Sequence, residues 1–383
     1  MAQPPSTALT PAQLTTAYNL GPLRKRGIDG AGQTIVIVDS FGSPTITADL
    51  ASFDSAFKLR APASLKIIRP AGPIPAYQDT TNRSGWASET SMDVEWAHAM
   101  APAASIVLVE TPTAETEGLA GFPQIVTAEN YVLHHHLGQV ISESFGATEE
   151  TFTSPAQLLS VRGPFELAER DHVTVLAAAG DDGSSGETTN MNSLYPRPVV
   201  EWPASDPLVT AVGGTQLNLS PDGQRMSPDV AWTDGGGGQS AIFARPSYQN
   251  GVAAVTGSHR GIPDISMDGS CSSPVAVYGT FPGGGGGWQS SCGTSLATPL
   301  MAGIVALADQ VAGHPLGLIN PALYKMSAAH SPGLVDVVSG DNAVRGDGGP
   351  TIPGFPAVPG YDLVSGVGTV NGALFVPELA RGG

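Results

Sequence analysis

The sequence predicts an α/β fold in which a mainly parallel sheet is flanked by helices. Short apolar runs rich in β-branched residues recur along the chain, and stretches with helical periodicity lie between several of them. The apolar runs are Thr34–Val38, Ser105–Val109, Gln139–Ser142, Val173–Ala177 and Leu208–Val212, and the helical stretches are 89–100, 124–137 and 155–171. Because uninterrupted apolar runs are typical of strands covered on both faces, we expect functional groups on the loops beyond the strand C-termini.

The helical stretch 89–100 carries two carboxylates, Glu89 and Asp93, four residues apart. On a helix this spacing stacks both side chains on one face, where they can share a proton and separate their pKa values. The same pattern is also typical of a solvated acidic face. The opposite face carries Val94, Ala97 and Met100, which indicates a partly buried helix.

Two strands end in acidic residues. Asp39 and Gly42 follow the run Thr34–Val38, and Gly180-Asp181-Asp182-Gly183 follows Val173–Ala177. A Gly-Asp-Asp-Gly string also suits a simple turn.

The two cysteines, Cys271 and Cys292, flank a predicted hairpin that runs from Pro274 through a glycine-rich turn to Trp288. Pairing across the hairpin is geometrically easy, and the alternative is two buried free thiols. We expect a disulfide, since other features of the chain point to export.

Ser295 lies in a string of small residues, Ser291-Cys-Gly-Thr-Ser295, followed by an apolar helix whose first turn is expected to contain Pro299. A hydroxyl at a helix N-terminus lies beside free backbone N–H groups that can stabilise an oxyanion. A simple helix cap gives the same residue type. The Gly-Thr-Ser-x-x-x-Pro string resembles the nucleophile segment of subtilisin-like enzymes. A serine nucleophile needs a base, and no histidine has the glycine-rich surroundings of a catalytic loop; the eight are His98, His134, His135, His136, His172, His259, His314 and His330.

Composition limits the classes of function. The chain has 383 residues, 41% of them hydrophobic, which is enough for a large core, and no linker divides it, so we expect a single domain over residues 1–383. The charge sum of 17 minus 34, or −17, is spread along the chain, which argues against nucleic acid or an anionic membrane as partner. No run of about 18 apolar residues predicts a membrane span.

Taken together, these motifs resemble the sedolisins, the serine-carboxyl peptidases with a subtilisin-like fold, from Leu9 to about Phe375. The resemblance implies that Ser295 is the nucleophile, Glu89 the general base and Asp93 its partner. It assigns Asp181, as a protonated acid, to the oxyanion. Asp39 is an accessory candidate, because an acid at this place extends the carboxylate network in some members of the family.

Other implications of the resemblance concern the groove and a metal. Segment 142–146 is expected to line the substrate groove, where Phe145 replaces a family tryptophan and cannot donate a hydrogen bond. One Ca²⁺ site is implied by two loops near the end of the chain. Its expected ligands are the side chains of Asp336 and Asp362 and the carbonyls of Val337, Val358 and Gly360.

We therefore expect an acid-active, secreted, monomeric endopeptidase that acts on proteins or peptides and matures by loss of a pro-domain. The N-terminal residues lack the pattern of an export signal, so any such signal has been removed or never existed. The alternatives are a tripeptidyl-type exopeptidase of the same family and a catalytically silent, calcium-bound module on the same scaffold. Residues 184–200 are expected to set side-chain preference.

Overall fold

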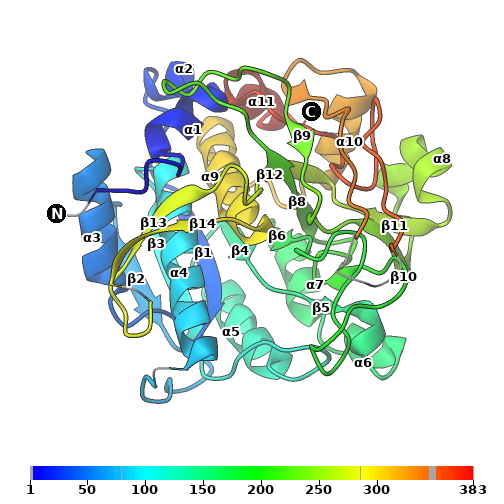
Figure 1. Cartoon of the computed structure of the whole chain (residues 1–383), viewed down its shortest axis with the longest axis horizontal. Helices are drawn as coiled ribbons and strands as arrows, with labels where there is room; N and C mark the ends of the chain where they lie inside the picture. Colours follow the sequence, from blue (N-terminus) through cyan, green and yellow to red (C-terminus); the bar gives the residue numbers. More distant parts are fainter. Residues whose placement is uncertain (1–2, 79, 285, 345–350, 383) are drawn as a thin grey trace.

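The computed structural model describes residues 3–78, 80–284, 286–344 and 351–382, and its centre is a mainly parallel sheet (Figure 1). Each neighbouring pair of strands along the path below is parallel, and β9 (Val230–Ala231) adds to β8 in the antiparallel sense. The order across the sheet is β12 (Ile265–Asp268), β8 (Thr210–Gln216), β6 (Thr174–Ala178), β4 (Val140–Glu143), β1 (Thr34–Ser40), β3 (Ser105–Thr111) and β2 (Leu65–Ile68).

Helices and small hairpins surround this sheet. The helices are α1 (Pro11–Ala17), α2 (Gly21–Arg24), α3 (Ile46–Phe57), α4 (Thr81–Met100), α5 (Phe122–His134), α6 (Pro155–Leu159), α7 (Gly163–Arg170), α8 (Ala253–Thr256), α9 (Thr294–Ala312), α10 (Asn320–Ala328) and α11 (Gly372–Leu379). The two-stranded pairs are β5 (Ala147–Thr148) with β7 (Glu201–Trp202), β10 (Gly238–Ala244) with β11 (His259–Ile262), β13 (Val275–Gly279) with β14 (Gly287–Ser291), and β15 (Leu334–Val335) with β16 (Thr369–Val370).

Each of the five predicted apolar runs lies in or overlaps a parallel strand, but two helix predictions were wrong in extent. The helix expected over 89–100 begins at Thr81, because the Thr80 side chain accepts a hydrogen bond from the Arg83 N–H and caps it there. The stretch 155–171 forms two helices. Pro164 has no N–H to continue a preceding helix, so the chain turns and starts α7.

The two faces of the sheet are covered by different helices. Ile35 and Ile37 of β1 point into the apolar cluster that contains α4 and α9, whereas Val36 and Val38 point into the cluster that contains α5 and α7. This alternation follows from the two-residue repeat of a strand. Asp39, the residue after Val38, therefore leaves the sheet on the α4 side, whereas Glu143, two residues after Ile141, leaves it on the α5 side. The site described below lies on the α4 side.

Helices α4 and α9 lie against one another at the centre of the molecule (Figure 1). Gly303 of α9 makes the approach possible, because a Cβ there would lie 2.4 Å from Met100 Cβ and 3.3 Å from the Ala97 carbonyl oxygen of α4. The sequence predicted a partly buried α4. In the structure every residue from Thr90 to Met100 is buried, on all sides of the helix. The acidic face is thus an interior face.

By length and composition alone, α9 could cross a membrane. It is instead covered by the protein, since 78% of its most apolar stretch is buried. A core helix of a folded domain explains the pattern.

The contact between α4 and α9 predicts the effect of Gly303→Ala. The added methyl group has no space, so we expect a loss of about 1–3 kcal/mol in the free energy of unfolding, measured by urea denaturation. The control is Gly163→Ala at the exposed start of α7, where a Cβ meets nothing within 4 Å. Equal stability of the two variants would show that the helices do not approach as described.

Candidate active site

Ser295 is the second residue of α9 and lies at the helix N-terminus, as predicted. Gly293 precedes the helix with φ +120°, a backbone conformation that side chains rarely adopt. The N–H groups of the first turn have no intrahelical acceptor. Ser295 therefore lies where the helix favours negative charge.

Pro299 was expected in the first turn of α9 but lies further inside the helix, and this position has a chemical consequence. Its missing N–H leaves the carbonyl oxygen of Ser295, four residues earlier, without the usual helical donor. The hydroxyl of Ser144 donates to that oxygen instead, at 3.0 Å. The segment after β4 is thus fastened to the residue that carries the candidate nucleophile.

The structure brings Glu89, Asp93 and Asp39 together behind Ser295. Glu89 lies within hydrogen-bonding reach of the Ser295 hydroxyl, and Asp93 is bonded to Asp39. Asp39 and Asp93 are fully buried, and the hydroxyls of Thr90, at Asp39, and Ser144, at Asp93, are the neutral partners that favour their charged forms. Since a carboxylate can only accept, hydrogen bonds between the carboxyl groups require protons on the carboxyls themselves.

Burial raises the pKa of each member of this carboxyl chain. The pKa of Asp39 rises to about 7, with loss of solvation as the main cause and the charge of Glu110 as a further one. Loss of solvation also raises the pKa of Glu89, to about 8, and that of Asp93 well above its usual value, with repulsion from Asp39 as the next cause for both. The chain therefore holds shared protons in acid.

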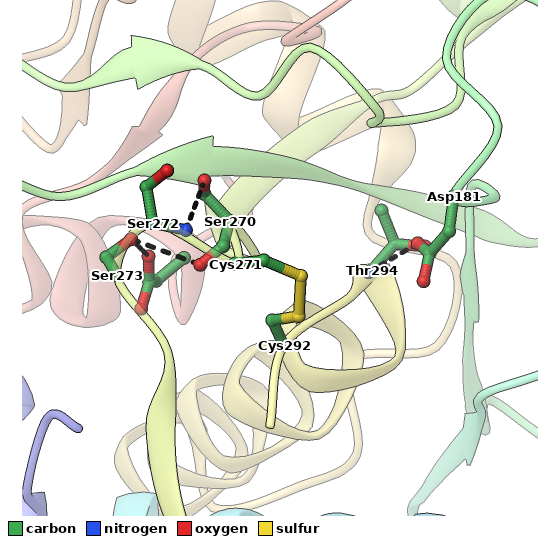
Figure 2. Close-up of a disulfide and its surroundings, with 8 residues drawn as sticks. Asp181, Ser270, Cys271, Ser272, Ser273, Cys292 and Thr294 are labelled. Atoms are coloured by element: carbon green, nitrogen blue, oxygen red, sulfur yellow. Dashed lines mark hydrogen bonds between the residues drawn. A yellow bond between two sulfur atoms is a disulfide. The ribbon is translucent and has the colours of Figure 1, made fainter. Parts of the chain in front are cut away.

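Asp181 lies in the loop after β6, where its side chain meets Thr294 at the start of α9 (Figure 2). Its Oδ1 accepts from both the backbone N–H and the hydroxyl of Thr294, each at 2.7 Å. The remaining oxygen, Oδ2, is then the place for a proton. Loss of solvation, caused by the surrounding protein, raises the pKa of Asp181. The side chain is still exposed to water in the groove. A bound peptide would displace that water.

Gly293 keeps open the space between Asp181 and Ser295. A Cβ on this residue would lie 2.6 Å from Asp181 Oδ2 and 3.6 Å from Ser295 Cβ. An oxygen atom in this space would lie close to both Asp181 Oδ2 and the Ser295 side chain. The gap has the position that an oxyanion would need.

Two connected pockets form a groove along these residues. One, of about 340 Å³, is lined by Trp86 and Glu89 of α4 and by Ser144 and Phe145. The other, of about 200 Å³, also contains Ser144 and Phe145 and adds Asp181 and Ser295. As expected, segment 142–146 contributes to the wall of this groove.

The second pocket has an acidic wall, which was not predicted. Glu115, Glu117 and Glu201 line it, and among the residues that the structure describes no arginine or lysine does. The Glu201 carboxylate is held against two glycines, since Cβ atoms on Gly146 and Gly180 would lie 2.5 and 2.8 Å from its oxygens. Loss of solvation is the main cause that raises the pKa of Glu117 to about 7 and those of the other two well above their usual values.

Cys271 and Cys292 are joined by a disulfide that spans 21 residues (Figure 2). Cys292 immediately precedes Gly293, whose N–H donates to the Gly269 carbonyl at 2.7 Å. The loop after β12 is thereby tied to the start of α9. Thr294, which holds Asp181, follows at once.

The loops predicted to bind calcium lie together. The Gly360 N–H donates to Asp336 Oδ2 at 2.9 Å, and the Val358 N–H donates to Asp362 Oδ2 at 2.9 Å. Val337 is buried beside Asp336. Within the described residues, no group of three or more His, Cys, Asp or Glu side chains converges as in an all-side-chain metal site. Oxygens from two carboxylates and several carbonyls still fit the preference of Ca²⁺.

Comparison with known proteins identifies the family. The model of the subtilase family matches residues 76–330, two thirds of the chain. Kumamolisin of Bacillus sp. is 33% identical over 337 residues, covering 84% of this chain and 55% of that protein. The structure of Pseudomonas sedolisin, described as a serine-carboxyl proteinase complexed with two molecules of pseudo-iodotyrostatin, matches with a TM-score of 0.83 and 25% identity over 100% of this chain and 99% of that one.

The chain belongs to the sedolisin family of subtilases. Human tripeptidyl-peptidase 1 is also similar, 29% identical over 316 residues that cover 76% of this chain and 50% of that protein. The chain spans about half the length of the curated sedolisin relatives it matches. The predicted subtilisin-like fold is confirmed.

Sequence reasoning missed several residues of this sedolisin site. Thr294 and Gly293 lie in a string that was singled out for Ser295 alone. Ser144 was included only as part of a groove segment. Glu201 was not considered, and its only signal in the sequence is an acidic residue between the apolar residues Val200 and Trp202.

The disulfide predicts that reduction will loosen the start of α9. Closing a loop of this length contributes about 3 kcal/mol to the free energy of unfolding. We expect no reactive thiol in the denatured, unreduced protein and two after reduction, with a matching fall in the melting temperature. The double variant Cys271→Ser/Cys292→Ser should melt like the reduced protein. Two thiols without reductant would contradict the pairing.

Proposed function

We propose that the chain is an acid-active serine-carboxyl endopeptidase. The observation that carries this proposal is the carboxyl of Glu89 within reach of the Ser295 hydroxyl, with two further buried carboxyls behind it. No histidine lines either pocket of the groove. The histidine on α4, His98, is occupied elsewhere, by Asp54 at 3.1 Å and by the Arg60 carbonyl at 2.9 Å.

The proposed reaction has two halves. Ser295 Oγ attacks the carbonyl carbon of the cleaved bond while its proton passes to Glu89, and the oxyanion accepts a hydrogen bond from protonated Asp181. Glu89 then gives the proton to the departing amine, which leaves an acyl group on Ser295. Water attacks this ester, its proton goes to Glu89, and the acid product leaves as the proton returns to Ser295 Oγ. Asp93 orients Glu89, and Asp39 supports Asp93.

Experiments can distinguish the proposed endopeptidase from two alternatives, a tripeptidyl-type exopeptidase and a catalytically silent calcium-bound module. The name of the tripeptidyl-peptidase relatives describes removal of tripeptides, so a free N-terminus would be required if this chain acted in the same way. The continuation of the groove to both sides of Ser144 and Phe145 favours cleavage within a chain. A silent calcium-bound module would not form a hemiacetal between Ser295 and a peptide aldehyde, whereas the proposed enzyme would.

We also propose secretion, protein or peptide substrates, maturation by loss of a pro-domain and a monomeric state. The disulfide supports an oxidising compartment. The matched part covers only 55% of kumamolisin and 50% of human tripeptidyl-peptidase 1, which leaves room in those proteins for a further segment.

The pH dependence tests the assignment of roles. The chain of Glu89, Asp93 and Asp39 must lose one proton before Glu89 can accept the proton of Ser295. Loss of solvation moves this first loss, which sets the acid limb of kcat/KM, above the ordinary glutamate value of 4.5. Asp181 must be protonated, so its raised pKa moves the upper limb above 3.8. We expect a bell on the acid side of neutrality, displaced upward from one set by free carboxyls, on an end-blocked chromogenic peptide.

Asp181→Asn separates the two limbs. The amide donates at every pH, so the variant should lose the upper limb while keeping the acid limb, even if it is slower. Asp222→Asn, on an exposed turn, is the matched control and should leave both limbs unchanged. An upper limb that persists in Asp181→Asn would remove Asp181 from the oxyanion role.

The acidic pocket predicts a preference for lysine at the residue whose carbonyl is attacked. A cationic side chain lowers the pKa of the carboxyls around it, so the ratio of kcat/KM for lysine to that for norleucine should rise with pH. Glu201→Gln should reduce this ratio about tenfold, since a hydrogen bond to a charged group contributes about 1.5–3 kcal/mol. Cleavage after norleucine serves as the internal control. An unchanged ratio would assign the lysine side chain to another pocket.

We propose one Ca²⁺ site held by Asp336, Asp362 and the carbonyls of Val337, Val358 and Gly360. The site would fix the loop of Asp362 to the loop of Asp336, which the Gly360 N–H already joins through its hydrogen bond to Asp336 Oδ2. Chelator should lower the melting temperature, and added Ca²⁺ should restore it. Asp336→Ala, which changes an exposed side chain, should abolish the difference between calcium and chelator. A calcium-dependent shift of full size in that variant would show that the ligands are misassigned.

A further inference from the structure

A second pair of buried carboxyls lies under the groove, outside the proposed reaction. Glu143 is the last residue of β4 and is fully buried, and Glu129 of α5 is 2% exposed. Glu143 leaves the sheet on the same face as Ile141, which belongs to the apolar cluster with α5 and α7. It therefore points away from the chain of Glu89 and Asp93.

The two carboxyls are hydrogen-bonded to each other. Neither oxygen of Glu143, nor Oε1 of Glu129, has an N–H or O–H partner with a fixed proton among the described residues. A hydrogen bond between two carboxyl groups needs a proton on one of them. The geometry therefore requires at least one bound proton.

No cation facing the pair is free to replace that proton, within the part of the chain that the structure describes. The charged groups nearest to Glu143 are Glu129 and Asp206. Arg162, at the start of α7, donates to both oxygens of Asp206, at 2.9 and 3.0 Å, and to Glu166 at 3.0 Å. Loss of the proton would leave two adjacent carboxylates buried without a counter-ion, which is strongly unfavourable.

The pair is joined to the groove by one peptide bond. Glu143 precedes Ser144, whose hydroxyl holds the Ser295 carbonyl that Pro299 leaves without a donor. Phe145 and Gly146 follow and line the pocket beside Asp181. A shift of Glu143 would therefore move a wall of the groove and the contact to the proposed nucleophile.

We propose that Glu129 and Glu143 are a positioning pair that shares a proton, fixes segment 142–146 in acid and releases it when the proton is lost. The role of the segment as a groove wall rests on the proposed function, but the sharing of the proton does not. Neither residue touches the reacting atoms. The pair acts through Ser144.

The direction of the pH dependence follows from linkage. Burial raises the pKa of Glu129 from 4.5 to about 7 and that of Glu143 well above 4.5, with repulsion between the two as a second cause for Glu143. Groups whose pKa is higher in the folded state stabilise it fully below the unfolded value, and this contribution is lost as the pH rises through the folded values. The window for release thus runs upward from 4.5 through about 7.

Hydrogen exchange of the 140–146 peptide tests the proposal without relying on catalysis. After correction for the intrinsic rate, we expect protection in the unmodified chain to fall at least about tenfold between about pH 4.5 and about pH 7.5. In Glu143→Gln the neutral amide can donate to Glu129, so the fall should be less than about twofold. Glu169→Gln, an exposed carboxyl on α7, is the control and should behave as the unmodified chain.

Two results would overturn the proposal. One is a segment equally protected at both pH values in the unmodified chain. The other is a parallel fall in the unmodified chain and in Glu143→Gln, which would assign the change to Glu89, Asp93 and Asp39. If Glu143→Gln does not fold, Glu129→Gln places the neutral amide on α5 and must give the same flattening. Failure of the peptidase assay with the expected exchange result would leave the pair intact and reject only the proposed function.

Discussion

The close approach of α4 and α9 is the contact on which the candidate site depends. Glu89 and Asp93 belong to one helix and Ser295 to the other, so the distance between the proposed base and the proposed nucleophile is set by how closely two helix backbones can pack. Gly303 allows that distance because it presents no side chain to Met100. A rigid helix pair holds catalytic groups more accurately than loops would, and here each loop group is then fastened to it.

The second constraint is that carboxyl groups are buried without cations. Asp39, Asp93 and Glu89 on one face of the sheet, and Glu129 and Glu143 on the other, have mainly each other as partners. In such surroundings a bound proton neutralises the carboxylate, as a metal ion or an arginine does in other proteins. The stability of the fold therefore depends on pH. The proposed activity in acid and this interior therefore depend on the same property, protonation of buried carboxyls. The net charge of −17 acts in the same direction at the surface.

Much of this architecture could be predicted from the sequence because it is local. Apolar runs gave the strands, and the spacing of Glu89 and Asp93 gave a shared helix face. The order of motifs indicated the family. What could not be predicted depends on residues far apart in sequence that meet only in the fold, such as Thr294 with Asp181, or Glu129 with Glu143. Helix ends were also missed where a single side chain decided them, as Thr80 does for α4.

The proline in α9 makes two positions epistatic: the effect of a change at position 144 depends on the residue at position 299. Pro299 creates the need for an external donor to the Ser295 carbonyl, and Ser144 supplies it. Each residue has its value only in the presence of the other. A helix with alanine at position 299 would satisfy that carbonyl internally and make the hydroxyl at position 144 redundant, while a chain without the hydroxyl would retain a helix with an unsatisfied carbonyl at its most important turn. The order of substitution therefore matters: a route that removes the hydroxyl at position 144 first passes through an intermediate with an unsatisfied carbonyl, whereas a route that replaces Pro299 first does not.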